Sequence, residues 1–466
     1  MAGPFPVKNA TVPYWRTQLH HLDSHRSTPE LPEKQDIVII GAGFAGAALA
    51  HYLLKGSPEN EPKPSITILE AREACSGATA RNGGHIRPDL FVALAARMQA
   101  QGLQTANQVA LFEVANAEAV AALVRDEGID CDLHAVTTGD VFVDAAEAAK
   151  IKKLWDAMTK LNCPTLRSVT YHGPSDAERV SGIAGAKVAF TYPAHVVWPY
   201  KLVMHLLEGA VGKGVNLQTK TTVHGISETV DEEGYWTVAT ARGATRAKRV
   251  VFATNAYTAG LLPEYDDAIY AARGTVCRVV PDAQNRPAAG IPLDSAGLEM
   301  ESPNSIDSYY GLRRDGSIIV GGGKSAFVDE REEWYRNYDD STLIRSTVPY
   351  FDRWAARTFI GWEGTETETE SIWTGIMGYS ADSAPHIGHV PSKPGQYICA
   401  GFDGHGMPNV LLCAKGLAEI IKDGRPFSET GVPAVYETSA ARLRKISELV
   451  AAPTVGRARA DIYLKF

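Results

Sequence analysis

Three closely spaced glycines give the first indication of chemistry. Gly41, Gly43 and Gly46 have the spacing of a turn that binds a dinucleotide, and Phe44 and Ala45 lie between them. The first glycine permits a tight turn, the second lets the backbone approach a pyrophosphate, and the third allows close helix–strand packing. The phosphates would then lie at the positive end of a helix, where free N–H groups point outward.

The segments around this turn predict the βαβ unit that has to position it. The apolar run 36–40 is typical of a buried parallel strand, 47–54 of a helix and 66–69 of a second strand. Glu70 ends the second strand, where an acidic residue accepts hydrogen bonds from ribose hydroxyls. Its spacing from Gly41 is longer than usual because a polar, Pro-rich loop, 56–65, intervenes. A nicotinamide and a flavin dinucleotide both remain open at this point.

A second glycine-containing segment follows at 76–84, with the sequence Ser-Gly-Ala-Thr-Ala-Arg-Asn-Gly-Gly. Its final glycines, Gly83 and Gly84, permit close approach of the backbone to a flat ligand. Arg81 could contact a phosphate or a ring edge, and Asn82 could do the same or only stabilise the loop. His85 and Arg87 come directly after and are candidates for a catalytic cavity.

With these segments the chain resembles the D-amino-acid oxidase, glycine oxidase and sarcosine oxidase family of FAD enzymes. The resemblance extends over about 36–424 and is nearest the gamma-glutamylputrescine oxidase branch, whose members carry a similar SGxxxRNGG stretch. Four parts of the sequence carry the resemblance: the glycine turn with Glu70 and Arg72, 76–84, 309–316 with 320–324, and 373–388 with 401–407. It implies an α/β fold in which a Rossmann-like FAD domain of the glutathione-reductase type carries a second, β-sheet-containing substrate domain.

The resemblance also implies which residues hold FAD. A Gly-rich loop before the apolar helix 407–422 would place N–H groups and a positive dipole end against the negative charge of reduced flavin. By similarity the cofactor residues are Gly41, Gly43, Phe44, Ala45, Gly46, Glu70, Ala71, Arg72, Ser76, Gly77, Ala78, Thr79, Arg81, Asn82, Gly83, Gly84, Val223, Ala253, Thr254, Asn255, Gly375, Gly401, Gly404, His405, Gly406 and Met407.

Two departures from the family predict that FAD is not covalently bound. The sarcosine oxidase branch holds its flavin through a cysteine, and the corresponding stretch 375–377 here is Gly-Ile-Met. Relatives with a histidine link have it in the segment where this chain has Arg81.

Five residues are candidates for catalysis. Lys324 is loosely similar to the lysine that the sarcosine oxidase branch places over the flavin to help oxygen accept an electron. Arg313 lies where the glycine oxidase branch carries a carboxylate-binding arginine, although Arg314 leaves the register open. His405, His85 and Tyr310 complete the set.

The character of the substrate has weaker sequence support. Tyr309, Tyr310, Trp373 and Tyr379 could form aromatic walls. An acidic group near the cavity mouth, Glu363, Glu366, Glu368 and Glu370, favours an amine over a simple amino acid.

Three functions therefore stay open. The first is an oxidase of an amine or amino acid that transfers hydride to flavin N5, gives an imine and reduces O2 to hydrogen peroxide. The second, in the same fold, is a dehydrogenase or demethylase with another electron acceptor, and the third is a flavin-containing binding module. An amino-acid-specific oxidase of the glycine oxidase type is the alternative within the first.

The expected domain organisation is discontinuous. We expect an N-terminal arm over 1–33 and an FAD domain over 34–92, 185–265 and 372–425. The substrate domain is expected over 93–184 and 266–371, followed by a C-terminal helical extension over 426–466.

Composition excludes several other classes of protein. The chain has 466 residues, a net charge of −8 and a pI near 5.9, which do not suit a nucleic-acid partner. No apolar run approaches the roughly 18 residues of a membrane span. The polar N-terminus predicts no signal peptide and the final Leu-Lys-Phe is no peroxisomal signal, so a cytoplasmic location is expected. Six scattered cysteines without CxxC predict neither disulfides nor a metal site, and the oligomeric state stays open.

Overall fold

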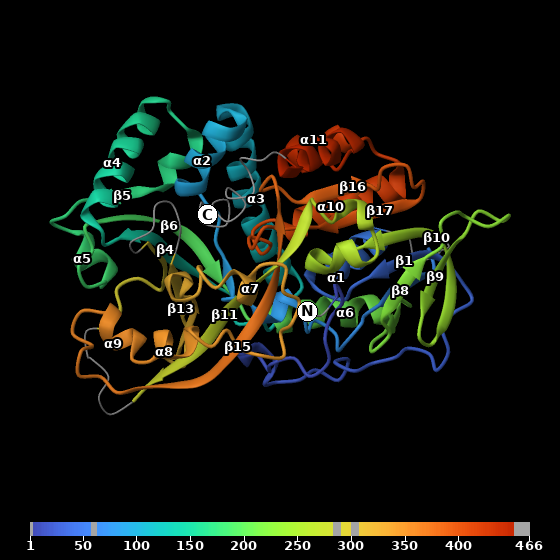
Figure 1. Ribbon diagram of the computed structural model, residues 1–466, viewed down its shortest axis with the longest axis horizontal. Coiled ribbons are helices and arrows are strands. Elements are labelled where there is room, and N and C mark those ends of the chain that lie inside the picture. Colours follow the sequence, from blue (N-terminus) through green and yellow to red (C-terminus); the bar gives the residue numbers. More distant parts are fainter. Residues whose placement is uncertain (1–2, 57–62, 283–289, 300–306, 452–466) are drawn as a thin grey trace.

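Two β-sheets form the framework of the protein. The computed structural model describes residues 3–56, 63–282, 290–299 and 307–451, so the C-terminal tripeptide lies outside the described residues. Figure 1 shows the two sheets side by side, with helices packed on their outer faces. This mixed arrangement confirms the predicted α/β fold with two sheets.

The first sheet has eight strands in the order β16-β17-β10-β1-β2-β7, with β9 paired to β10 and β8 paired to β9. Its centre is parallel, because β1 pairs in parallel with both β2 and β10. The strands are β1 (Lys34–Ile40), β2 (Ile66–Leu69), β7 (Asn216–Gln218), β8 (Val223–Ile226), β9 (Trp236–Thr240), β10 (Gly243–Phe252), β16 (His386–His389) and β17 (Gln396–Ala400).

Apolar side chains cover this sheet on both faces. Ile37 and Ile39 of β1 pack in one core with residues of α1 (Phe44–Leu54), α6 (Pro199–Gly212) and α10 (Val410–Asp423). Val38 and Ile40 point to the other face, where the core includes residues of β8, β9 and α11 (Ala440–Ala451). Burial on both faces explains why β1 reads as a continuous apolar run.

The second sheet has nine strands in the order β15-β11-β14-β13-β12-β4-β6-β3, with β5 paired to β6. The strands are β3 (His85–Ile86), β4 (His134–Phe142), β5 (Thr170–His172), β6 (Val188–Val196), β11 (Ile269–Pro281), β12 (Ser295–Glu299), β13 (Ser308–Leu312), β14 (Ile318–Gly322) and β15 (Thr367–Ser380). β13 and β14 are the hairpin that Asp315-Gly316 predicts.

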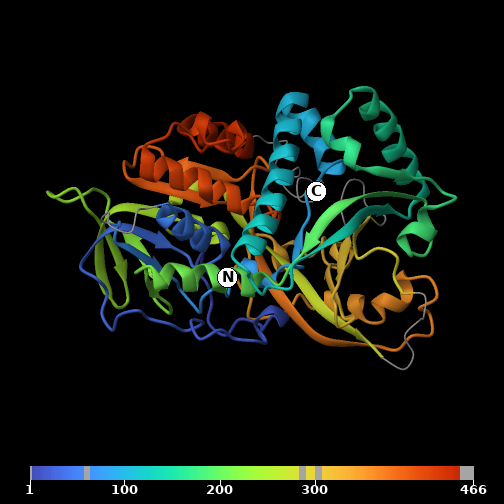
Figure 2. The same cartoon turned by 180° about the vertical axis from the view of Figure 1, so that it is seen from behind.

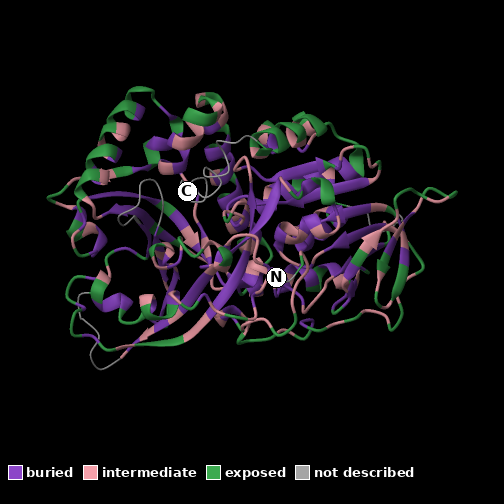
Figure 3. Ribbon diagram, in the orientation of Figure 1, coloured by how far each residue is buried: buried purple, intermediate pink, exposed green. Residues whose placement is uncertain are grey.

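Helices cover both faces of the second sheet as well. Val141 packs in a core with α8 (Thr347–Phe351) and α9 (Trp354–Thr358), whereas Phe142 packs with α2 (Val92–Gln101) and α4 (Ala145–Lys160). The short helix α5 (Ala177–Ser181) contributes Ala177 to the same core as Val141, and the short helix α7 (Arg331–Trp334) contacts β11. In Figure 3 the strands are mostly buried and the outer surfaces of these helices are exposed.

Long elements connect the two halves. Strand β11 contributes Ile269 to a core of the first sheet and Cys277 to a core of the second, and it pairs with β15 along its whole length. Helix α3 (Leu103–Asp126) packs against α10, and in Figure 2 it stands between the two halves. The site described below lies where these elements meet.

The helical region shows where the sequence prediction was incomplete. The sequence predicts that the Ala-rich stretch 93–160 is helical, with breaks near Gly128 and at 137–143. The stretch forms α2, α3 and α4, and the strand β4 lies at the second break. A further break at Gly102, where φ is +86°, separates α2 from α3 and was not predicted. None of the described helices is both long and apolar enough to cross a membrane.

The predicted domain boundaries remain a prediction, and two strands bear on them. β6 lies in the range 185–265 and most of β15 in 372–425, both assigned to the cofactor domain, yet both strands belong to the second sheet. The described part of the C-terminal extension contains α11 after short turns.

Candidate active site

A cavity of about 460 Å³ joins the glycine turn to the second sheet. The ends of β1 and β2, the segment 77–83 and the loop after β17 line one part of it. Residues of β11, β13 and β15 line another part. The cavity therefore brings together residues from all four parts of the sequence that carry the family resemblance.

The glycine turn needs glycine at both ends. Gly41 has φ of +110°, and a Cβ placed there would lie 2.6 Å from the Ala253 carbonyl oxygen. A Cβ on Gly46 would lie 2.0 Å from the carbonyl oxygen of Gly41. Only glycine lets the turn, the helix α1 and the residue after β10 approach this closely.

The start of α1 is suited to a pyrophosphate. Gly43 is its N-cap and provides no side-chain cap, and Gly43, Phe44 and Ala45 line the cavity. The first N–H groups of a helix lack partners within the helix and carry its positive dipole end. Thr79 Oγ1 accepts the Phe44 N–H at 3.1 Å, which ties the segment 77–83 to this turn.

Glu70 lies at the end of β2 and faces the cavity. Its carboxylate accepts the N–H of Ala42 and that of Arg72, both at 2.9 Å. Two carboxylate oxygens can accept about four hydrogen bonds, so ribose hydroxyls can still be bound there. Nearby, the buried Tyr257 hydroxyl has no hydrogen-bond partner among the described residues and also lines the cavity. These features fit a dinucleotide cofactor.

The Arg81 side chain connects separate segments of the backbone inside the protein. Its Nε donates to Ser76 O at 2.8 Å and its Nη1 donates to Thr374 O at 2.7 Å. The carboxylate of Asp340 lies 3.4 Å away and also binds Arg72, at 2.8 Å. Burial lowers the pKa of Arg81 to about 10. Although Arg81 lines the cavity, the internal contacts of its guanidinium occupy most of its donors.

The N-terminal arm contacts Arg81, and the sequence did not predict this contact. Thr11 Oγ1 accepts a hydrogen bond from Arg81 Nη1 at 3.1 Å and one from the Thr374 N–H at 3.0 Å. Phe5 and Pro6 of the arm line the cavity itself.

The loop after β17 is fixed by Asn255. Asn255 Oδ1 accepts the N–H groups of Gly401 and Phe402 at 3.1 and 3.2 Å. Gly404 and Met407, which follow in the same loop and precede α10, line the cavity. α10 begins at Val410, three residues later than predicted.

A buried acid lies behind this loop. Glu113 of α3 is fully buried, with its carboxylate 3.1 Å from His405 Nε2 and 3.2 Å from Arg97 Nη1. Burial works against ionisation, but the charges of His405 and Arg97 outweigh it and lower the pKa of Glu113 to about 2. Beside them, burial raises the pKa of Asp403 to about 6.

The predicted cofactor residues mostly meet in the cavity. Those that line it are Gly41, Gly43, Phe44, Ala45, Glu70, Ala71, Arg72, Gly77, Ala78, Thr79, Arg81, Asn82, Gly83, Val223, Ala253, Thr254, Asn255, Gly375, Gly404, His405, Gly406 and Met407. Gly46, Ser76, Gly84 and Gly401 lie behind the lining and support it. What each residue binds stays a prediction.

The catalytic candidates divide into two groups. Lys324, His85 and His405 line the cavity, and His85 packs edge-on against Tyr309. Arg313 and Tyr310 do not line it, so the placement expected for them needs correction.

Contacts inside the protein explain why Arg313 and Tyr310 lie outside the cavity lining. Arg313 is buried, pairs with Asp132 and stacks over the ring of Trp15 at 5.0 Å. Tyr310 alternates with Tyr309 along β13, so its side chain enters the core, where its hydroxyl donates to Leu293 O at 3.1 Å.

The structure also changes the expectations about the aromatic walls and the acidic residues of the cavity. Tyr309 and Tyr379 line the cavity, whereas Trp373 is fully buried and its Nε1 donates to Arg81 O at 2.9 Å. The acidic residues Glu363, Glu366, Glu368 and Glu370 are not part of the lining, and Glu370 pairs with Arg278. The expectation of an acidic cavity mouth was therefore wrong.

Cations occupy part of the lining instead. Arg97 lines the cavity, and its Nη1 forms an ion pair with the buried Glu113 at 3.2 Å. Arg87, which the sequence proposed without a partner, pairs there with the buried Asp140 and donates to Tyr192 Oη at 2.9 Å. Nothing in the Ala-rich sequence around Arg97 marks it as a site residue.

Comparison with known proteins shows the family of this chain. The family model described as FAD dependent oxidoreductase (DAO) matches residues 36–420. The probable oxidoreductase OrdL of Haemophilus influenzae is 23% identical over 448 residues, which cover 90% of this chain and 92% of that protein.

Solved structures share the fold at lower identity. Glycine oxidase from Bacillus cereus is 18% identical with a TM-score of 0.63, over 84% of this chain and 96% of that one. L-Proline dehydrogenase from P. horikoshii is 20% identical with a TM-score of 0.65, over 87% of this chain and 98% of that one. Because the family model matches most of the sequence, this chain belongs to the DAO family of FAD-dependent oxidoreductases.

Proposed function

We propose that this protein is an oxidase that acts on a C–N bond of an amine or amino acid. The observation that carries the proposal is the continuous cavity, which joins a dinucleotide turn to a wall of aromatic and cationic side chains. Two structural neighbours, a glycine oxidase and an L-proline dehydrogenase, are enzymes of amino acids by name, which supports the choice of substrate class.

The cofactor would supply the redox chemistry. FAD, when bound, accepts a hydride from the carbon next to nitrogen and passes the electrons to oxygen, which leaves as hydrogen peroxide. The chain supplies orientation and charge. The backbone of Gly404–Met407 would face the negative charge of the reduced ring, and Lys324 would lower the free-energy cost of the first electron transfer to oxygen.

The cofactor would be held without a covalent bond. Gly375 packs closely against Arg81, since a Cβ on Gly375 would lie only 3.2 Å from Arg81 Cβ, and neither residue offers a nucleophile. Cys399 lines the cavity, but burial raises the pKa of its thiol to about 12. Acid precipitation would therefore leave the yellow colour in the supernatant, and a yellow pellet would contradict this.

A carboxylated amine is the second candidate substrate, and Arg97 favours it. Its guanidinium lies in the lining, where Nη1 also forms an ion pair with Glu113 at 3.2 Å, whereas Arg313 lies outside the lining and pairs with Asp132. A planar guanidinium binds a carboxylate through two parallel hydrogen bonds, which an ammonium group cannot reproduce.

The two candidates can be separated with Arg97→Lys, which keeps the charge beside Glu113 and removes the planar fork. An amine and its α-carboxylated analogue are assayed with wild type and variant, with FAD content as the control for folding. If the carboxylated compound is preferred and loses its kcat/KM advantage in the variant, the carboxylated class is correct. If the plain amine is the better substrate of both proteins, the amine is correct.

A further inference from the structure

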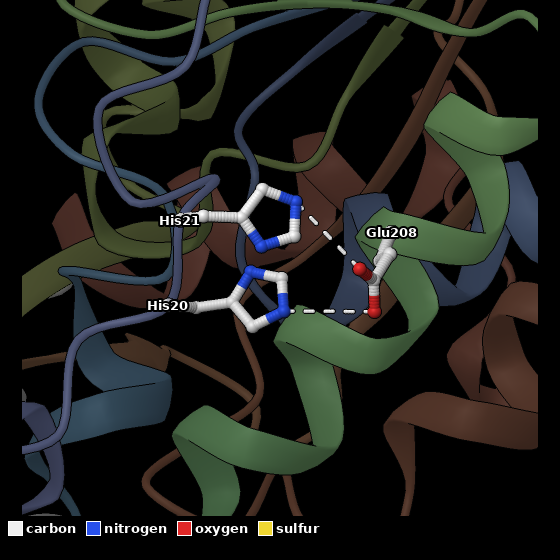
Figure 4. Close-up of side chains that lie close together, drawn as sticks. All are labelled: His20, His21 and Glu208. Atoms are coloured by element: carbon white, nitrogen blue, oxygen red, sulfur yellow. Dashed lines mark ion pairs between the residues drawn. The ribbon is translucent and has the colours of Figure 1, made fainter.

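Three metal-binding side chains converge on the surface, away from the cavity. His20 and His21 of the N-terminal arm both direct Nε2 toward the carboxylate of Glu208 on α6, as Figure 4 shows. Each Nε2 lies 3.6 Å from an oxygen of Glu208, and one ligand atom from each residue lies within 4.8 Å of the others. None of the three lines the cavity, so the redox site does not account for them.

The separations suit a shared metal ion better than hydrogen bonds. A distance of 3.6 Å is longer than a hydrogen bond from nitrogen to oxygen. Two ligands about 2.0–2.2 Å from a tetrahedral zinc ion are themselves roughly 3.4 Å apart, close to the observed spacing. Two imidazoles and one carboxylate are a known zinc ligand set, with a fourth position left for water.

The arm is already held where the ion would bind. The His20 N–H donates to Tyr200 Oη at 3.1 Å, and the Tyr200 hydroxyl donates to Asp23 Oδ1 at 2.8 Å. Arg16 closes this cluster by an ion pair with Asp23 at 2.7 Å. Because Tyr200 and Glu208 both belong to α6, the backbone of the two histidines is fixed relative to the third ligand, and binding has little ordering cost.

We propose that His20, His21 and Glu208 bind one zinc-like divalent cation that fastens the N-terminal arm to α6. The ion takes Nε2 of each imidazole and an oxygen of the carboxylate, and water fills the remaining position. Leu22 N–H donates to Nδ1 of His20 at 3.2 Å, so ligation moves the ring proton to Nδ1 and ends that hydrogen bond. The sequence predicted no metal site, because only the cysteines were considered as ligands.

Zinc binding to the FAD-loaded full-length protein tests this proposal. Zinc is titrated by calorimetry and by competition with a chromophoric chelator, with Co²⁺ as a spectroscopic probe of tetrahedral coordination. The variants are Glu208→Gln and His20→Ala, and the control is His25→Ala, because His25 belongs to the same segment and contacts Ser27 instead. Melting temperatures without metal show whether each variant is folded.

The proposal expects one zinc ion per chain in wild type and His25→Ala, with a higher melting temperature in its presence. Glu208→Gln and His20→Ala should bind at least about tenfold more weakly while melting normally without metal. Mg²⁺ should have no effect because it prefers oxygen ligands. Absence of zinc binding in wild type, unchanged affinity in Glu208→Gln, or an equal effect of Mg²⁺ would overturn the proposal.

Discussion

At the scale of single residues, Glu70 is the residue that we propose to connect the fold to the cofactor. Its carboxylate already accepts two backbone N–H groups at 2.9 Å and faces the cavity. Replacing Glu70 by Ala should weaken FAD binding by about 1.5–3 kcal/mol, the usual value of a hydrogen bond to a charged group. Fluorescence titration of FAD into the apoprotein measures this. Glu73→Ala is the control, since Glu73 pairs with Lys220 outside the cavity. Equal losses in both variants would contradict the role of Glu70.

The lowered pKa of Glu113 should make the free energy of unfolding depend on pH. Its pKa is about 2 in the folded protein, below the ordinary value near 4.5, so the ionised carboxylate stabilises the folded state above about pH 4.5. That contribution is lost as the pH falls toward 2. Glu113→Gln should therefore unfold more easily than wild type at pH 7, by a difference that shrinks in acid. The exposed Glu118→Gln on the same helix is the control. A difference that does not change with pH would refute this account.

Local sequence predicted the residues of the glycine turn and failed at long-range pairs. Gly41 and Glu70 belong to one βαβ unit, whose spacing carries the information. The cluster of Arg97, Glu113 and His405 joins two helices to a distant loop, and no local pattern marks such a contact. Arg313 was misplaced for the same reason, because its partner Asp132 is remote in sequence.

At the scale of elements, close packing of α1 on the glycine turn sets the geometry of the proposed cofactor site. A methyl group on Gly46 would lie 2.0 Å from the Gly41 carbonyl oxygen, so Gly46→Ala must displace the helix from the turn. We expect that variant to lose FAD and to melt at a lower temperature. Gly209→Ala, in open space on α6, should instead stabilise the protein by about 0.5–1 kcal/mol. Normal FAD content in Gly46→Ala would contradict this.

Elements with a clear period or turn chemistry were predictable, and those fixed by distant packing were not. β2 begins and ends at the predicted residues, and the hairpin β13–β14 follows its Asp-Gly turn. The arm has no strand or α-helix among its described residues, yet Trp15 is completely buried against distant segments. Such burial depends on partners far along the chain, which the local sequence does not reveal.

At the scale of the whole molecule, the cavity between the two sheets combines two tasks. We propose that the first sheet and its glycine turn bind the dinucleotide. The opposite wall has Tyr309 from the second sheet and Lys324 from the turn after β14. β11 contributes residues to both cores, so one continuous strand connects the two halves.

Anaerobic reduction followed by oxygen tests the central claim most directly. The purified yellow protein is mixed without oxygen with a panel of amines and amino acids, and the absorbance of oxidised FAD is followed. We predict that at least one compound bleaches it, and that added oxygen restores the colour with one hydrogen peroxide formed per flavin. If dithionite bleaches the protein but no amine or amino acid does, the proposed C–N oxidation is wrong. If the bleached protein recovers only with another electron acceptor, the enzyme is a dehydrogenase and not an oxidase.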